Sequence, residues 1–302
     1  MQLHDPFETA KLLPFAGLVK ALRVGVLDHA ANGIACPTRL SVPLQKDGLM
    51  LSMPASAEDI AIQKLVTICP ANRAKKLPTV CGFVMACDTQ TGEPLFGLDG
   101  ATVTGRRTAA MTVLATQVLR RAAPQSILII GTGEQASYHV RAFTECFPDA
   151  RIQVRGAMRD AALAFCEQHI GIAPTLRAAA AGAVDESIDL VITLTTSKTP
   201  VYCEPARASR LVAAVGAFTP DAAEIAPELV KTSTVIVDDP AGAAHEAGDI
   251  LLAGIDWSGV RSLADAIHTP IPAGQSVFYK SVGCAAWDLA ACRLARQELQ
   301  TN

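Results

Sequence analysis

The chain has 302 residues, of which half are hydrophobic and 18% are charged. That length favours two domains, and so apolar a composition excludes an intrinsically disordered chain. A formal net charge of −3, with no run rich in Lys or Arg, leaves no electrostatic footprint for nucleic acid or an anionic membrane. No apolar stretch reaches the ~18–20 residues that span a bilayer, and the first residues lack the pattern of a signal peptide. We therefore expect a cytoplasmic protein.

The nine cysteines are irregularly spaced. They form no C-x-x-C pair, and no Cys/His cluster has the spacing of a zinc site. This pattern is typical of reduced thiols that pack as small hydrophobic side chains, so we expect no bound metal.

The first third of the chain predicts an α+β domain. Residues 6–32 carry apolar side chains at helical spacing and end at Asn32-Gly33. Residues 34–98 then hold short apolar or alternating runs between turn residues, which predict a meander of strands at 49–51, 60–66 and 80–85. A further helix is predicted at 104–122.

From Ser126 the pattern becomes one of alternating strands and helices. Residues 127–130 are a continuous apolar run, as in a strand buried on both faces. A glycine loop, a helix at about 134–147 and further strands follow, which favours a Rossmann-type doubly wound parallel sheet. We expect this α/β domain at 116–275 and the α+β domain at 1–115, joined by a C-terminal helical segment at 276–302. On the helix after the glycine loop, His139 is expected at the surface or an interface.

The glycine loop predicts a site for a nicotinamide dinucleotide. Its sequence is Gly131-Thr132-Gly133-Glu134-Gln135-Ala136, and it joins the buried strand to a helix. The first glycine allows a tight turn, the second lets the backbone approach the pyrophosphate, and the alanine permits close packing of helix and strand. The phosphates would then lie at the helix N-terminus. A glycine turn of some other α/β protein is the alternative.

The end of the second strand bears on the choice between the two nicotinamide cofactors. NAD sites usually place an acidic residue there for the ribose 2′-hydroxyl. Here Arg155 and Arg159 occupy this region, and no carboxylate stands at the strand end. Guanidinium groups suit a 2′-phosphate, so we expect NADPH to be preferred, with NADH as the alternative cofactor. The alternative is that the two arginines are solvated surface residues with no role in cofactor binding.

Three cationic residues of the first domain lie on or beside apolar segments. They are Arg39, Lys64 within the strand predicted at 60–66, and Arg107 at the start of the helix predicted at 104–122. A lone strand lysine is more often an edge residue whose ammonium group reaches solvent. Three cations around one cleft would instead bind a carboxylate substrate.

The chain resembles the ornithine cyclodeaminase/mu-crystallin family along nearly its whole length. The matching segments are Pro37-Thr38-Arg39, Lys64-Leu65-Val66-Thr67, Asp88-Thr89-Gln90-Thr91-Gly92, Arg107-Thr108-Ala109-Ala110, the glycine loop, Val215-Gly216-Ala217, Val237-Asp238-Asp239, Ser281-Val282-Gly283 and Asp288-Leu289-Ala290-Ala291. The resemblance implies a homodimer with a Rossmann domain, whose other domain binds substrate and dimerises. It implies that Arg39, Lys64 and Arg107 bind a substrate carboxylate, and that Thr108, Thr195 and Ser197 contact the cofactor.

One departure from the family pattern is informative. Ornithine cyclodeaminases have a catalytic Asp at the position where this chain has Phe218. Phe can neither exchange a proton nor bind an ammonium group by charge. The segment Gly216-Ala217-Phe218-Thr219-Pro220-Asp221 is similar to the bacterial Δ1-pyrroline-2-carboxylate reductases of the family, and Phe218 would form an apolar wall beside a small ring. Asp221 replaces the missing Asp only if the register shifts.

The resemblance thus implies reduction of a cyclic ketimine. Hydride would pass from the nicotinamide to C2 of Δ1-pyrroline-2-carboxylate, giving L-proline, and Δ1-piperideine-2-carboxylate is the six-membered alternative. Lys64 or an ordered water would protonate the ring nitrogen. The rivals are an ornithine cyclodeaminase and a non-catalytic NADPH-binding protein like the crystallins. A role in hydroxyproline breakdown is what the resemblance suggests.

Overall fold

The computed structural model describes residues 1–180 and 182–301. Residues 181 and 302, which fall in the segments predicted at 116–275 and 276–302, lie outside the described residues. The chain divides into unit 1, Met1–Ala110 with Cys284–Asn302, and unit 2, Met111–Gly283. The first division, after residue 110, falls within a helix and five residues before the boundary predicted after residue 115. The second division, after residue 283, falls eight residues past the boundary predicted after residue 275.

Unit 1 is built on a six-stranded sheet of order β1-β6-β5-β4-β3-β2. Its β1 pairs in parallel with β6, and the other neighbours are antiparallel. The strands are β1 (Gln2–His4), β2 (Leu40–Pro43), β3 (Leu49–Ser56), β4 (Ala61–Ile68), β5 (Val80–Cys87) and β6 (Pro94–Asp99). The helices are α1 (Pro6–Lys11), α2 (Phe15–Ala30), η1 (Pro70–Lys75), the first half of α3 (Gly100–Leu119) and α10 (Ala285–Thr301).

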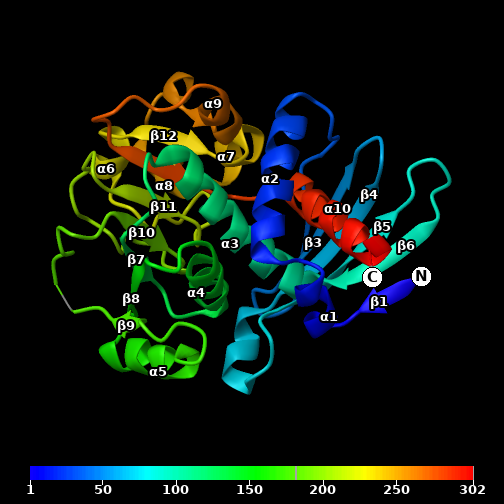
Figure 1. Ribbon diagram of the computed structural model, residues 1–302, viewed down its shortest axis with the longest axis horizontal. Coiled ribbons are helices and arrows are strands. Elements are labelled where there is room, and N and C mark those ends of the chain that lie inside the picture. The colour runs from blue at the N-terminus through cyan, green and yellow to red at the C-terminus, as the bar shows by residue number, and fades with distance from the viewer. Residues whose placement is uncertain (181, 302) are drawn as a thin grey trace. The chain divides into compact units, whose positions relative to one another are not determined.

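Two helices far apart in sequence close the core of unit 1. Figure 1 shows α10 lying beside α2, and α10 also contacts β3 and β4. Trp287 of α10 is buried and meets the ring of His29 edge-on, with 5.6 Å between ring centroids. The strands alternate buried and half-buried residues, as expected of a sheet with one face on a core.

Unit 2 has the Rossmann-type arrangement. Its sheet has the order β13-β12-β14-β11-β10-β7-β8-β9, and every pair is parallel. The strands are β7 (Ser126–Ile130), β8 (Arg151–Arg155), β9 (Arg177–Ala178), β10 (Leu190–Thr193), β11 (Leu211–Ala214), β12 (Thr234–Val237), β13 (Arg261–Ser262) and β14 (Val277–Lys280). The helices are α4 (Glu134–Cys146), α5 (Arg159–His169), α6 (Pro227–Lys231), α7 (Pro240–Glu246), α8 (Gly248–Ala253), η2 (Trp257–Gly259) and α9 (Leu263–His268).

Two helix boundaries differ from the prediction. The helix predicted at 104–122 begins at Gly100, because the Asp99 side chain accepts a hydrogen bond from the Thr102 amide and so caps it. The segment predicted as helical at 276–302 starts with β14, a strand between β11 and β12. Residues 281–283 then lie outside any helix and are held by buried Asp238, whose carboxylate accepts bonds from the Ser281 hydroxyl and the amides of Val282 and Gly283.

Two smaller expectations concern the cysteines and one histidine. All nine cysteines are free thiols. The placement of His139 at a surface was wrong, because it is fully buried between the Thr112 hydroxyl, at 3.0 Å, and the Gln135 carbonyl, at 2.8 Å. Burial lowers the pKa of His139 to about 4.

Among the described residues, no helix has the length and hydropathy needed to cross a membrane.

Candidate functional site

Lys64 is a fully buried cation in the interior of the unit 1 sheet. It lies in β4 between Met53 of β3 and Val84 of β5, on the face that the alternation of β4 turns toward the core. Only 1% of it is exposed. The edge position that a lone strand lysine suggests is therefore wrong, and the buried ammonium group needs a partner.

Asp288 is that partner. The Lys64 Nζ atom donates to both carboxylate oxygens, at 2.9 and 3.0 Å. Asp288 is fully buried on α10, and its Oδ1 also lies 3.4 Å from Nε of Arg107 on α3. Two cations thus share one carboxylate.

Arg39, Lys64 and Arg107 are here called the cation cluster; Lys64 and Arg107 are buried and Arg39 is half-buried. Burial lowers the pKa of Lys64 to about 8, Asp288 opposes that shift, and the positive charges of Arg107 and Arg39 add to it. The four groups together carry three positive charges and one negative. The structure therefore brings together the three cations singled out from the sequence, in a setting that favours an added anion.

The predicted glycine loop of unit 2 follows β7, all of whose residues are buried. Gly131 has a φ of +129°, and a Cβ there would lie 2.6 Å from the Leu194 carbonyl oxygen, so only glycine fits. Gly133 is the N-cap of α4, with no side-chain cap, and a Cβ there would meet no atom within 4 Å. The protein's own packing does not demand that glycine, which fits an approach by a phosphate group.

The other predicted cofactor residues occupy different places. Arg155 ends β8, half-buried, with Nη2 donating to the Ala180 carbonyl at 3.3 Å. Arg159 is exposed at the start of α5. Thr108 lies buried on α3 in unit 1, whereas all the other predicted cofactor-binding residues belong to unit 2.

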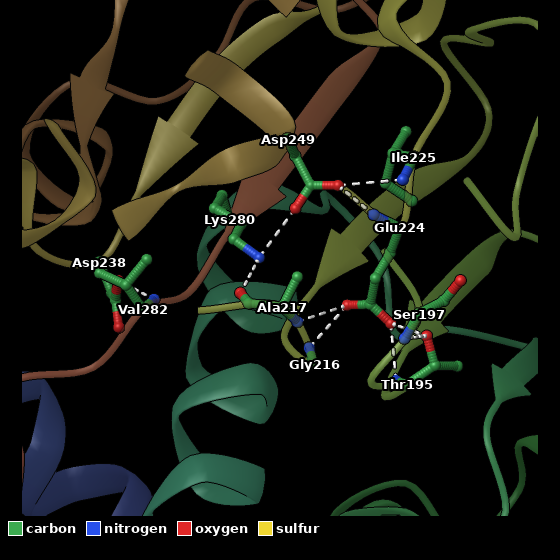
Figure 2. Close-up of polar contacts among 10 residues, drawn as sticks. All are labelled: Thr195, Ser197, Gly216, Ala217, Glu224, Ile225, Asp238, Asp249, Lys280 and Val282. Atoms are coloured by element: carbon green, nitrogen blue, oxygen red, sulfur yellow. Dashed lines mark hydrogen bonds and ion pairs between the residues drawn. The ribbon is translucent and has the colours of Figure 1, made fainter. Parts of the chain in front are cut away.

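Thr195 and Ser197 follow β10 at the carboxyl edge of the sheet. Figure 2 shows both beside the carboxylate of Glu224, which accepts bonds from the Thr195 amide at 2.6 Å and its hydroxyl at 2.9 Å. The Ser197 amide donates to the Thr195 hydroxyl oxygen at 3.3 Å. The second Glu224 oxygen accepts from the amides of Gly216 and Ala217, at 2.7 and 3.1 Å. Glu224 therefore joins the loops after β10 and β11.

Glu224 is itself anchored by a buried ion pair. Asp249 accepts bonds from the amides of Glu224 and Ile225, at 2.6 and 2.9 Å, and lies 2.8 Å from Nζ of Lys280 (Figure 2). Lys280 also donates to the Ala217 carbonyl at 2.5 Å. All three charged side chains are inaccessible to solvent, and burial raises the pKa of Glu224 while Lys280 opposes that shift.

Phe218 and Asp221 lie on the loop after β11. Phe218 directly follows Ala217 and is 36% exposed. Asp221 is exposed and accepts bonds from Lys198 at 2.6 Å and from the Thr219 hydroxyl at 2.7 Å. A carboxylate bound in this exposed pair is poorly placed to replace the Asp that the family pattern has at 218.

Asp288 and Glu224 were not singled out as site residues from the sequence. Both are acids among apolar residues, in Ala285-Ala286-Trp287-Asp288 and Ala222-Ala223-Glu224-Ile225. A lone acid in an apolar run was the available signal, since burial of such a group requires a partner. The partners themselves, 224 residues away for Lys64 and Asp288, follow only from the fold.

The chain is similar to known proteins over nearly its whole length. The Δ1-pyrroline-2-carboxylate reductase 1 of Burkholderia multivorans is 55% identical over 297 residues, which cover 98% of this chain and 96% of that protein. A Δ1-pyrroline-2-carboxylate/Δ1-piperideine-2-carboxylate reductase of Azospirillum brasilense is 54% identical, with the same coverage. The structure of the Thermococcus litoralis Δ1-pyrroline-2-carboxylate reductase in complex with NADH and L-proline superposes with a TM-score of 0.90 at 25% identity, covering 100% of this chain and 98% of that one.

A family model covers almost the whole chain as well. The description of that model is ornithine cyclodeaminase/mu-crystallin family, and it matches residues 9–302. The match includes the cation cluster, the glycine loop and the loops that Glu224 joins. The chain therefore belongs to the ornithine cyclodeaminase/mu-crystallin family.

Proposed function

We propose that this protein reduces Δ1-pyrroline-2-carboxylate to L-proline with NAD(P)H. The observation that carries the proposal is the cation cluster, with Lys64 and Arg107 buried, which suits a small carboxylate, on a chain more than half identical to reductases of that substrate. The relative from A. brasilense is also named for Δ1-piperideine-2-carboxylate, so the six-membered ring is proposed as a second substrate.

The residues of unit 1 would bind the carboxylate and protonate the ring nitrogen. Arg39 and Arg107 provide fixed guanidinium donors for a carboxylate. Among the described contacts of Lys64, two of its three N–H groups go to Asp288, which leaves one for a substrate. With a pKa of about 8, Lys64 is mostly protonated at neutral pH and can still release its proton. We assign it as the proton donor to the imine.

The residues of unit 2 would bind the dinucleotide. The glycine loop would hold the pyrophosphate at the N-terminus of α4, and the loops after β10 and β11 would flank the remainder of the cofactor. NAD(P)H supplies, when bound, the hydride that C2 of the ring accepts while the nitrogen gains a proton. Phe218 would give the substrate an apolar neighbour.

NADPH is proposed as the preferred form of the cofactor. Arg155 ends the strand where NAD sites usually carry an acidic residue, and Arg159 opens the next helix. Guanidinium groups there suit a 2′-phosphate. We further propose that the enzyme is a homodimer and acts in hydroxyproline breakdown, as the family resemblance suggests.

One set of assays separates this function from its rivals. Purified protein is incubated with NADPH and Δ1-pyrroline-2-carboxylate, and separately with ornithine and NAD. Loss of NADPH absorbance with L-proline formation is the expected result. Ammonia release from ornithine would identify a cyclodeaminase instead, and NADPH binding without turnover of either substrate would identify a binding protein. The exposed ion pair of Asp221 favours the first outcome.

A further inference from the structure

Two loops of unit 2 touch through their backbones at the carboxyl edge of the sheet. They leave the adjacent parallel strands β10 and β11, with Thr193 opposite Ala214. A Cβ at Gly216 would lie 2.2 Å from the Thr195 carbonyl oxygen and 2.3 Å from its nitrogen. Residues other than glycine are therefore excluded at position 216, and the contact between Gly216 and the Thr195 backbone sets the separation of the two loops.

Glu224 adds a second, polar connection between the same loops. Each carboxylate oxygen serves one loop, the first bonding Thr195 and the second bonding Gly216 and Ala217. Its backbone is fixed too, because Asp249 accepts from its amide and its carbonyl accepts from Val201 and Tyr202. A charged group fully removed from water and bonded at every polar atom holds its neighbours in one geometry.

The position of these loops identifies what they would hold. A dinucleotide lies across the carboxyl edge where the strand order reverses, which here is at β7. Its adenosine half goes to the side of β8, where the residue that recognises the ribose stands. The nicotinamide half must then lie on the other side of β7, along β10 and β11.

We propose that Glu224 is a positioning residue for the nicotinamide end of the cofactor site. It holds the loops after β10 and β11 at a fixed separation, and Asp249 and Lys280 hold Glu224. The inference rests on the proposed use of a nicotinamide dinucleotide.

The hydrogen bonds also fix how Thr195 can meet a cofactor. Its hydroxyl proton goes to Glu224, and the hydroxyl oxygen accepts from the Ser197 amide. The Ser197 hydroxyl in turn donates to the Thr199 carbonyl at 2.6 Å. Thr195 is therefore restricted to accepting a bond from the cofactor, for which the amide N–H groups of the nicotinamide are suitable donors.

The test compares a whole cofactor with a fragment that lacks only the nicotinamide. NADPH and 2′-phospho-ADP-ribose are titrated calorimetrically into wild type and Glu224→Gln. The Gln amide nitrogen would face loop N–H donors in place of an acceptor, so the affinity for NADPH should fall about tenfold or more. The affinity for the fragment should stay within about twofold. An equal loss of affinity for NADPH and for the fragment, or no loss of affinity for either, overturns the proposal.

A matched control and a second variant guard against loss of folding. Arg120 is half-buried and pairs with the Asp189 carboxylate at 3.0 Å, directly before β10 at the opposite edge of the sheet. Arg120→Met should lower the melting temperature and leave both affinities unchanged; the same selective loss of NADPH affinity in this control contradicts the proposal. Should Glu224→Gln fail to fold, Glu224→Asp keeps the charge but shortens its reach to the two loops, and unchanged NADPH affinity in that variant overturns the proposal. Neither titration uses the imine, so failure of imine reduction would contradict the proposed function alone.

Discussion

Two lysines, Lys64 in unit 1 and Lys280 in unit 2, are fully buried in strands, yet their surroundings differ. Lys64 shares its carboxylate with Arg107 and feels the charge of Arg39. Lys280 faces the carboxylate of Asp249 and the Ala217 carbonyl, beside the second carboxylate of Glu224. An excess of cations prepares the first lysine to bind an anion or release a proton. An excess of acceptors makes the second a fixed structural donor.

The largest expected effect follows from removing the charge of Lys64. Lys64→Met deletes the proposed proton donor to the imine, so kcat/KM for Δ1-pyrroline-2-carboxylate should fall about 10³-fold. The measurement is steady-state reduction at saturating NADPH, with calorimetric titration of NADPH as the check on folding. Near-normal turnover would remove Lys64 from the chemistry.

Removing Lys280 should mainly cost stability. Lys280→Met leaves Asp249 and Glu224 buried without their shared cation, which lowers the free energy of unfolding by about 3 kcal/mol. Urea unfolding measures this loss. At saturating NADPH, turnover per folded molecule of Lys280→Met should stay well above that of Lys64→Met. An equal loss of turnover in the two variants would contradict the different roles of the two lysines.

A smaller effect is expected at the cofactor site. Arg155→Ala should raise KM for NADPH about tenfold, equivalent to ~1.4 kcal/mol, and leave KM for NADH near its wild-type value. Initial rates over a range of each cofactor provide the comparison. An unchanged KM for NADPH would assign Arg155 to the solvated surface.

The smallest effect is a displacement of the pH profile. The proposed donor is the protonated form of Lys64, so kcat/KM should fall as the pH rises through about 8, the pKa of that group. The charge of Asp288 raises that pKa, and Asp288→Asn should therefore move the fall to lower pH. A wild-type rate that stays constant to pH 10 would contradict the role of Lys64.

Local sequence patterns predicted the elements that depend on local chemistry. The buried strand at 127–130, the glycine loop and the alternation from 126 to 237 gave the Rossmann-type unit, because each is a short-range pattern of apolar and turn residues. Lys64 and Arg107 were also found, but through the family resemblance; spacing by itself left an edge lysine as the alternative.

Long-range partners and buried polar residues were beyond the reach of such patterns. His139 was expected at a surface or an interface, yet Thr112 and Gln135 satisfy both ring nitrogens in the core. Residues 277–280 were assigned to a helical segment because nothing local distinguishes a four-residue strand that pairs only with β11 and β12. The bonds of Glu224 to two loops likewise required the sheet to be assembled first.

The most direct test of the cation cluster asks whether it recognises a carboxylate. Reduction of Δ1-pyrroline-2-carboxylate by NADPH is compared with reduction of Δ1-pyrroline, the same ring without its carboxylate, in wild type and Arg107→Met. Wild type should prefer the carboxylated ring by orders of magnitude, and the variant should lose most of that preference. An equal preference in both proteins would contradict the account.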